Sequence, residues 1–228
     1  VLNVVPGFGD VGEALGRHDD VDAVSFTGST EVGGLFMKYS GESNLKTIGL
    51  EMGGKSPFIV LDDAKITDDL IDNAINSAFW NGGQNCSANM RQIIHSKVKD
   101  EFLDKVTKKV KALKVGDPLD PTSNMGSMIS KKHLKTVDGF IQKGIDEGAK
   151  LLFGGVSDGG KKGFYAKPTL FDDLKENMTI AQEEIFGPVL GVLTINNTEE
   201  ALKVASNSKY GLHASVFTQD IDKAFHLA

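Results

Sequence analysis

Residues 57–95, PFIVLDDAKITDDLIDNAINSAFWNGGQNCSANMRQIIH, predict an apolar strand, an amphipathic helix, a glycine-rich loop and a second apolar strand, in that order. The strands are expected at Pro57–Leu61 and Arg91–His95. Apolar residues three or four apart predict the helix, which starts between Asp63 and Thr67 and runs to Phe79. Two apolar strands joined through a helix are typical of a parallel βαβ unit, so this segment indicates an α/β fold.

The same alternation of strands and helices continues on both sides of this segment. Further strands are expected over 2–5, 23–26, 46–50, 151–153, 165–171, 189–195 and 214–217. Further helices are expected over 13–18, 31–39, 98–113, 131–147, 199–206 and 221–227, and a glycine-rich surface loop over 154–163. Alternation throughout the chain predicts largely parallel sheets.

The loop after the first of these helices holds the only cysteine of the chain, Cys86. Two glycines precede it and Ser87 and Ala88 follow it, so the thiol has small neighbours. A helix beginning at this point would direct backbone N–H groups at the sulfur and favour the thiolate, as a nucleophile requires. A lone cysteine is more often a small buried apolar residue, so the loop by itself leaves both interpretations open.

Composition narrows the classes of partner. The chain has 25 Lys and Arg against 31 Asp and Glu, with no basic block, so we expect no nucleic-acid partner. One cysteine excludes an intrachain disulfide, and the five histidines lack metal-ligand spacing, so we expect no metal site. With no apolar run of ~18 residues and no visible signal peptide, we expect no membrane span and a cytoplasmic protein. Because Val1 opens directly on a predicted strand, we expect a longer parent protein.

Two segments could bind phosphate. Gly7–Gly12 fits the G-x-G-x-x-G pattern, but the next predicted strand, Ala23–Phe26, does not end in the acidic residue that this dinucleotide-binding pattern requires. The second segment is the better candidate, because a strand runs into Gly28 and Ser29 or Thr30 can cap the following helix. By itself that segment equally predicts an ordinary strand–turn–helix.

Two acidic stretches are the remaining candidates for a catalytic or binding role. Glu51 follows a strand and precedes Gly53 and Gly54, where a carboxylate could face a cleft and act as a base, although a solvated turn glutamate is more common. Glu183 and Glu184 precede an aromatic residue and a Gly-Pro turn.

Four motifs, in this order and spacing, together resemble the NAD(P)-dependent aldehyde dehydrogenases. They are Phe26–Thr30, Glu51–Pro57, Gly83–Ala88 and Glu183–Val189, and the resemblance extends from Leu2 to Leu227. It implies an aldehyde dehydrogenase-like α/β fold. Residues 1–51 would be the second half of a Rossmann-like cofactor domain, and 52–228 most of the catalytic domain, truncated at its C-terminal end.

The resemblance also implies the chemistry. Cys86 would attack the aldehyde to form a thiohemiacetal and then a thioester, and Glu51 would activate the water that hydrolyses the thioester. The amide of Cys86 would help to hold the oxyanion. The cofactor, NAD or NADP, would contact a further set of residues: Gly28, Ser29 and Gly33 at the pyrophosphate, Met52 nearby, and Glu184 and Phe186 at the nicotinamide end.

The substrate and assembly are less closely defined. A small aldehyde is expected, and Asp117–Pro121 and Gly41–Asn44 look similar to members that oxidise aminoaldehydes such as γ-glutamyl-γ-aminobutyraldehyde. The expected pocket residues are Phe79, Trp80, Asn85 and Ser87, although core packing is an equal alternative for Phe79. The parent is expected to be a homo-oligomer, and the isolated chain to be inactive.

Two other functions remain open. A CoA-acylating semialdehyde dehydrogenase would transfer the thioester to a thiol and would need no base, which Glu51 argues against. A non-catalytic truncated product would keep the motifs passively.

Overall fold

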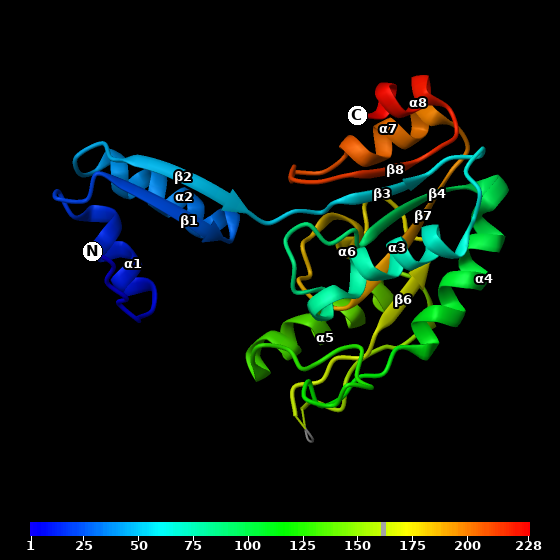
Figure 1. Ribbon diagram of the computed structural model, residues 1–228, viewed down its shortest axis with the longest axis horizontal. Helices are drawn as coiled ribbons and strands as arrows, with labels where there is room; N and C mark the ends of the chain where they lie inside the picture. Colours follow the sequence, from blue (N-terminus) through cyan, green and yellow to red (C-terminus); the bar gives the residue numbers. More distant parts are fainter. Residues whose placement is uncertain (161–162) are drawn as a thin grey trace. The chain divides into compact units, whose positions relative to one another are not determined.

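The computed structural model describes residues 1–160 and 163–228, which form two compact units, Val1–Gly53 and Gly54–Ala228 (Figure 1). Residues 161 and 162, inside the glycine-rich loop predicted over 154–163, lie outside the described residues.

The first unit contains a parallel pair of strands, β1 (Ala23–Gly28) and β2 (Thr47–Met52), connected through helix α2 (Thr30–Gly41). Helix α1 (Gly9–Arg17) packs against α2. The ring of Phe36 on α2 lies 4.8 Å from that of Phe26 on β1, measured between centroids, and so joins helix to sheet. This is the βαβ unit that the alternation predicts.

The strand predicted at Leu2–Val5 is wrong. The segment has no regular secondary structure, and Leu2 is 89% exposed. A strand needs a neighbour to take up its backbone hydrogen bonds, and neither β1 nor β2 pairs with this segment. A short segment with three apolar residues forms a strand only where such a neighbour exists.

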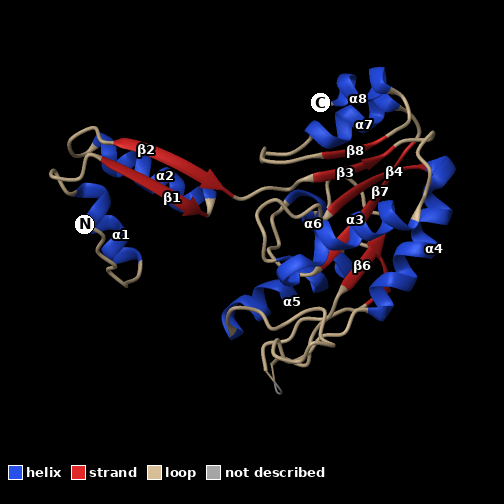
Figure 2. Ribbon diagram, in the orientation of Figure 1, coloured by secondary structure: helices blue, strands red, loops and turns tan. Residues whose placement is uncertain are grey.

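The second unit is built on a six-stranded sheet (Figure 2). Its strand order is β5-β6-β7-β4-β3-β8, and every neighbouring pair is parallel except β5 with β6, which is antiparallel. The strands are β3 (Pro57–Val60), β4 (Arg91–His95), β5 (Lys150–Phe153), β6 (Thr169–Asp172), β7 (Val189–Ile195) and β8 (Ser215–Phe217). The prediction of a largely parallel sheet is therefore confirmed.

Helices cover both faces of this sheet. They are α3 (Asp68–Phe79), the 3-10 helix η1 (Trp80–Gly83), α4 (Ser96–Ala112), α5 (Lys131–Asp146), α6 (Thr179–Gln182), α7 (Thr198–Ser206) and α8 (Ile221–Leu227). Side chains of β3 alternate between the faces: Phe58 and Val60 join the apolar cluster of α3 and α4, whereas Ile59 joins that of α5, α6 and α7.

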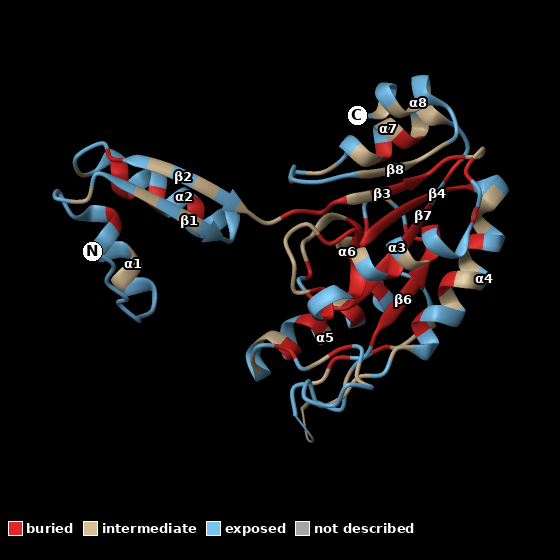
Figure 3. Cartoon of the chain, viewed as in Figure 1, coloured by how far each residue is buried: buried red, intermediate tan, exposed pale blue. Residues whose placement is uncertain are grey.

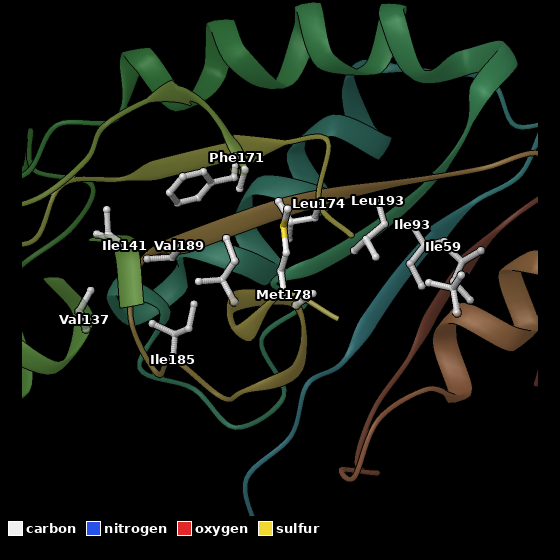
Figure 4. Packing of buried hydrophobic residues seen from close by; sticks show 14 of the residues in the cluster. Ile59, Ile93, Val137, Ile141, Phe171, Leu174, Met178, Ile185, Val189 and Leu193 are labelled. Atoms are coloured by element: carbon white, nitrogen blue, oxygen red, sulfur yellow. The ribbon is translucent and has the colours of Figure 1, made fainter. Parts of the chain in front are cut away.

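Both clusters are well buried. The central strands are among the most buried parts of the unit (Figure 3). Figure 4 shows the second cluster, in which Ile59, Ile93 and Leu193 of the sheet lie beside residues of the covering elements such as Ile141 and Ile185. The continuous apolar runs of the sequence are these strands, which are buried from both sides.

Candidate active site

The loop that carries Cys86 begins with a left-handed turn. Helix α3 ends at Phe79, and Asn81, Gly82 and Gly83 then have φ values of 52°, 64° and 69°. The Asn81 side chain donates to the Gln84 carbonyl at 3.0 Å, and the Gln84 side-chain amide donates to the Asn81 carbonyl at 3.1 Å. Three residues of positive φ, two of them glycine, turn the chain sharply away from the helix, and the two hydrogen bonds fix the turn.

Two glycines bring this loop against a second motif. A Cβ atom on Gly83 would lie 2.5 Å from the carbonyl oxygen of Gly187, which no real side chain tolerates. Gly187 belongs to the turn after Glu183 and Glu184, far along the chain. The absence of a side chain at Gly83 therefore allows the cysteine loop and this turn to touch.

Cys86 itself is half-buried and lies in a turn. The Asn85 side-chain oxygen accepts hydrogen bonds from the Ser87 amide at 3.4 Å and from the Ser87 hydroxyl at 3.2 Å, and lies 3.9 Å from the Cys86 sulfur. Among the described residues, none accepts a hydrogen bond from the Cys86 amide. This amide is therefore free to donate to an oxyanion beside the sulfur.

No helix begins at Cys86, so the helix start considered for this point is not formed. After the turn, the Asn89 amide donates to Ser77 O at 3.1 Å and its side chain to Pro57 O at 2.8 Å, and the chain then enters β4. These bonds tie the segment to α3 and β3 in an extended course. No helix N-terminus is present to favour the thiolate here.

Glu184 lies across Gly54 from the cysteine loop. Its Oε1 accepts a hydrogen bond from the Gly54 amide at 3.2 Å. A Cβ atom on Gly54 would lie 2.8 Å from Cys86 O, so the backbone of Gly54 is close to both motifs. Burial raises the pKa of the Glu184 carboxyl, while the Gly54 amide and the Lys55 charge act in the opposite direction.

Phe186 is held in a strained conformation with its ring partly exposed. Its φ is 54° and its exposed fraction is 39%. The Phe186 carbonyl lies 2.6 Å from Nε2 of His133 on α5, and the two rings meet edge to face at 6.1 Å. No sequence pattern pointed to His133, because its partner is more than fifty residues away.

The two aromatic residues before the loop differ. Phe79 is 4% exposed and belongs to the apolar cluster of α3 and α4, which favours the core-packing alternative for its side chain. Trp80 is 66% exposed. Of this pair, only Trp80 presents its ring to the surface.

The remaining predicted residues belong to the first unit. Gly28 ends β1, and Ser29 caps α2, with its hydroxyl accepting from the Val32 amide at 3.3 Å. A Cβ atom on Gly33 would lie 2.5 Å from the Met52 sulfur, so Gly33 lets α2 pack closely on β2. The first amides of a helix have no partner within it and attract anions, so this corner fits the pyrophosphate of a dinucleotide.

Glu51 lies beside this corner, near the end of β2. It is exposed and stands opposite Thr27 in the register of the two strands.

Residues 1–160 and 163–228 contain neither a cluster of metal ligands nor a helix that could cross a membrane. No three His, Cys, Asp or Glu side chains in these ranges lie together as metal ligands would. No helix within them is long and apolar enough to cross a membrane.

The family is decided by a match over the entire sequence. Residues 1–228 match the model of the aldehyde dehydrogenase family. The chain belongs to the aldehyde dehydrogenase family. The resemblance carried by the four motifs is thereby confirmed, together with the fold it implied.

Relatives and solved structures agree with this assignment. The mitochondrial aldehyde dehydrogenase of Mesocricetus auratus is 46% identical over 100% of this chain and 45% of its own length. A γ-glutamyl-γ-aminobutyraldehyde dehydrogenase structure from Burkholderia cenocepacia matches with a TM-score of 0.93 and 41% identity over 98% of this chain and 45% of that one. An indole-3-acetaldehyde dehydrogenase structure in complex with NAD+ matches with a TM-score of 0.96 and 44% identity, over 100% of this chain and 46% of that one. The chain thus spans slightly less than half the length of these aldehyde dehydrogenases.

Proposed function

We propose that this chain is the central part of an enzyme that oxidises an aldehyde to a carboxylic acid with NAD or NADP, using Cys86 as nucleophile and Glu51 as general base. The observation that carries the proposal is the Cys86 turn, in which a half-buried thiol stands beside a backbone amide that no described residue uses. Family membership supplies the reaction class. The similar structure in complex with NAD+ supports the cofactor.

The proposed chemistry begins at the thiol. The Cys86 sulfur forms a bond to the aldehyde carbon, and the carbonyl oxygen takes up the displaced electron pair as an oxyanion, which the Cys86 amide stabilises. NAD, when bound, would accept the hydride that converts the thiohemiacetal into a thioester. Glu51 then removes a proton from water, the resulting hydroxide attacks the thioester carbon, and the thiolate leaves with the carboxylic acid released.

Other residues would hold the cofactor and position these groups. Ser29 and the first amides of α2 fit the pyrophosphate, while Gly33 keeps α2 close to Met52. Glu184, which accepts a hydrogen bond from the Gly54 amide, would bind the ribose attached to the nicotinamide. Phe186 would pack against the nicotinamide ring.

Steady-state and pre-steady-state kinetics of the full-length protein test the two catalytic roles. Cys86→Ser should abolish NADH formation with propionaldehyde. Glu51→Gln should retain a burst of about one NADH per site and then turn over at least ~100-fold more slowly, because hydrolysis alone has lost its base. Glu101→Gln, which alters an exposed carboxylate on α4, is the matched control and should behave like wild type.

Other results would assign another function. Product that appears only with added CoA, at a rate unaffected by Glu51→Gln, would identify the acylating enzyme. A Cys86 that reacts with a thiol reagent no faster than a model thiol, together with no NADH, would identify a passive protein. The isolated 228-residue chain is expected to be inactive in any case, since it spans under half the length of the relatives.

The finer assignments are proposals of the same kind. We infer an aminoaldehyde substrate from the similarity to a γ-glutamyl-γ-aminobutyraldehyde dehydrogenase, and a substrate panel measured as kcat/KM tests it. Asn85, Ser87 and Trp80 are the side chains expected near that substrate. A homo-oligomer and a cytoplasmic location stay predictions, and several relatives are named as mitochondrial.

A further inference from the structure

A cavity of about 330 Å³ lies within the second unit, between strands β3 and β4 and helix α7. Its walls combine apolar residues with a small polar group. The apolar residues are Pro57, Ile59, Leu202, Leu212 and Leu227, and the polar ones include Lys55, Ser56, Arg91, Tyr210 and His213. The described residues that line it include no carboxylate.

Lys55 is the unusual member of this group. Its side chain is only 4% exposed, yet none of the described residues accepts a hydrogen bond from its Nζ or forms a salt bridge with it. Its Nζ is not one of the fully enclosed polar atoms that lack a partner, so the amine reaches the open space of the cavity. An ammonium group on so buried a residue is costly without a partner. The cavity is the space into which a partner for this amine would fit.

The charged groups around Lys55 are already engaged. Glu183 binds Lys209 at 2.7 Å and accepts from the Tyr210 hydroxyl at 3.3 Å, and Glu184 accepts from the Gly54 amide. Both attract Lys55 only at longer range, while Arg91 repels it. The local carboxylates therefore leave the Lys55 amine unsatisfied.

Arg91 adds a second positive charge. It is 2% exposed, and its terminal nitrogens donate to the carbonyls of Val204, Ala205 and Asn207 at 2.6–3.2 Å. Carbonyl groups accept from its terminal nitrogens but do not neutralise its charge, and its Nε has no hydrogen-bond partner among the described residues. The cavity is thus an apolar space with two cations at its polar end, which is complementary to an anion carrying a short hydrocarbon chain.

We propose that this cavity binds a small aliphatic carboxylate, with the carboxylate on the Lys55 ammonium and the hydrocarbon chain against Leu202, Leu212 and Leu227. The proposal concerns a site apart from Cys86 and does not depend on the catalytic roles assigned above. Apolar walls favour a carboxylate over inorganic phosphate, which has no apolar part.

Proton and ligand binding should be coupled at this site. Desolvation lowers the pKa of Lys55 to about 7, with Arg91 acting in the same direction and Glu184 and Glu183 opposing it. The carboxylate binds the protonated amine, so the protonated fraction sets the apparent affinity. Between pH 6 and pH 8 that fraction falls from about 0.9 to about 0.1, and the dissociation constant should rise about ten-fold.

The test measures protection of Lys55 in the full-length protein. Trace labelling with fluorodinitrobenzene at pH 7, followed by mass spectrometry, reports the reactivity of each lysine. Butyrate should reduce labelling of Lys55 at least five-fold at saturation and leave the exposed Lys111 on α4 unchanged. Butanol and inorganic phosphate should not protect. Equal protection by butanol would show that only the apolar space is filled, and equal protection by phosphate would show a general anion site; either result overturns the proposal.

Variants supply an independent measurement. Butyrate should raise the Tm of wild type and of Lys111→Met but not of Lys55→Met, in which an apolar side chain of similar length replaces the buried amine. His213→Gln should keep the ten-fold pH dependence, because Lys55 and not His213 carries it. A Tm shift retained in Lys55→Met, or a Lys55 that is unreactive until urea is added, would contradict the site.

Discussion

At the scale of single residues, Gly83 decides whether the cysteine loop can meet the turn before β7. It has a φ of 69°, and a Cβ atom there would approach Gly187 O to 2.5 Å and the Met90 methyl carbon to 2.4 Å. Both the backbone conformation and the close contact exclude a side chain. The loop and the turn can therefore keep their present contact only if residue 83 is glycine.

Gly83→Ala should lower the free energy of unfolding by about 2–4 kcal/mol, the sum of backbone strain and overpacking against backbone. The matched control is Gly139→Ala on α5, where a Cβ atom would meet nothing within 4 Å. That change should leave stability equal or raise it by about 0.5–1 kcal/mol. Urea unfolding of the two variants measures the contrast, and equal midpoints would show that the loop yields without cost.

Lys55 makes stability depend on pH in a defined direction. Its pKa in the folded protein, about 7, is below the ordinary lysine value, so the folded state binds this proton less tightly than the unfolded state. The resulting penalty is fully present below pH 7 and disappears as pH rises from 7 towards 10.5.

Lys55→Met removes that penalty. In the absence of carboxylates, the variant should be more stable than wild type by about 1–4 kcal/mol at pH 6.5. The difference should shrink towards zero by pH 10, since wild type then carries a neutral amine in both states. Thermal unfolding across this range tests the sign, and a difference that stays constant with pH would rule out the titration of Lys55 as its cause.

At the scale of secondary-structure elements, helix α8 is held by its polar contacts more than by burial. None of its residues is buried, and Ile221 and Phe225 are 66% and 76% exposed. Lys223 reaches Asp62 at 3.2 Å, and Lys97 of α4 binds the same carboxylate at 3.0 Å. Hydrogen bonds from these two lysines lower the pKa of Asp62 to about 2.

Asp62→Asn should therefore loosen α8 selectively. Amide exchange of residues 221–227 should become several-fold faster at pH 6, while exchange in β4 stays unchanged. Because the Asp62 pKa is depressed, its contribution is present above the unfolded value of about 4 and is lost as pH falls through 2. Asp72→Asn, which breaks the equivalent contact between α3 and Lys109, is the control and should leave 221–227 unaffected.

Whether an element could be predicted from the sequence depends on what stabilises it. Strands with continuous apolar runs, such as Pro57–Val60 and Val189–Ile195, were predictable because burial from both faces leaves a clear pattern. The expected cap at Ser29 or Thr30 likewise marked the start of α2, which Ser29 caps. The strand predicted at Leu2–Val5 failed, because a strand depends on a neighbouring strand, and neither β1 nor β2 pairs with this segment.

The site residues also differ in how far the sequence predicted their roles. Cys86 and Glu184 belong to recognisable motifs, and their positions on either side of Gly54 agree with a shared site. Lys55 lies inside the Glu51–Pro57 motif but had no role predicted for it, and His133 belongs to none of the four motifs. The position of this lysine, two residues before the buried strand Pro57–Val60, was an available indication that a charge would be enclosed.

At the scale of the whole molecule, the two units differ in how much apolar surface they bury. Buried residues of the first unit are few, with Phe36 and Tyr39 the only apolar side chains among those less than 9% exposed or at that limit. The second unit has two large apolar clusters, one on each face of its sheet. Hydrophobic burial dominates folding stability, so the first unit should be much less stable than the second.

Hydrogen exchange of the 228-residue chain on its own measures this difference. With increasing urea, amides of β1 and β2 should open at lower denaturant than those of β4 and β7, with a gap on the order of 3 kcal/mol or more at zero denaturant. The two parallel pairs, β1 with β2 and β4 with β7, are matched in hydrogen-bond pattern, so the gap isolates the contribution of burial. Opening of all four strands with one common free energy would mean that the first unit is stabilised by contacts other than its own core. This difference in opening free energy also determines how often the segment around Ser29 is unfolded while the second unit, which holds Cys86, stays folded.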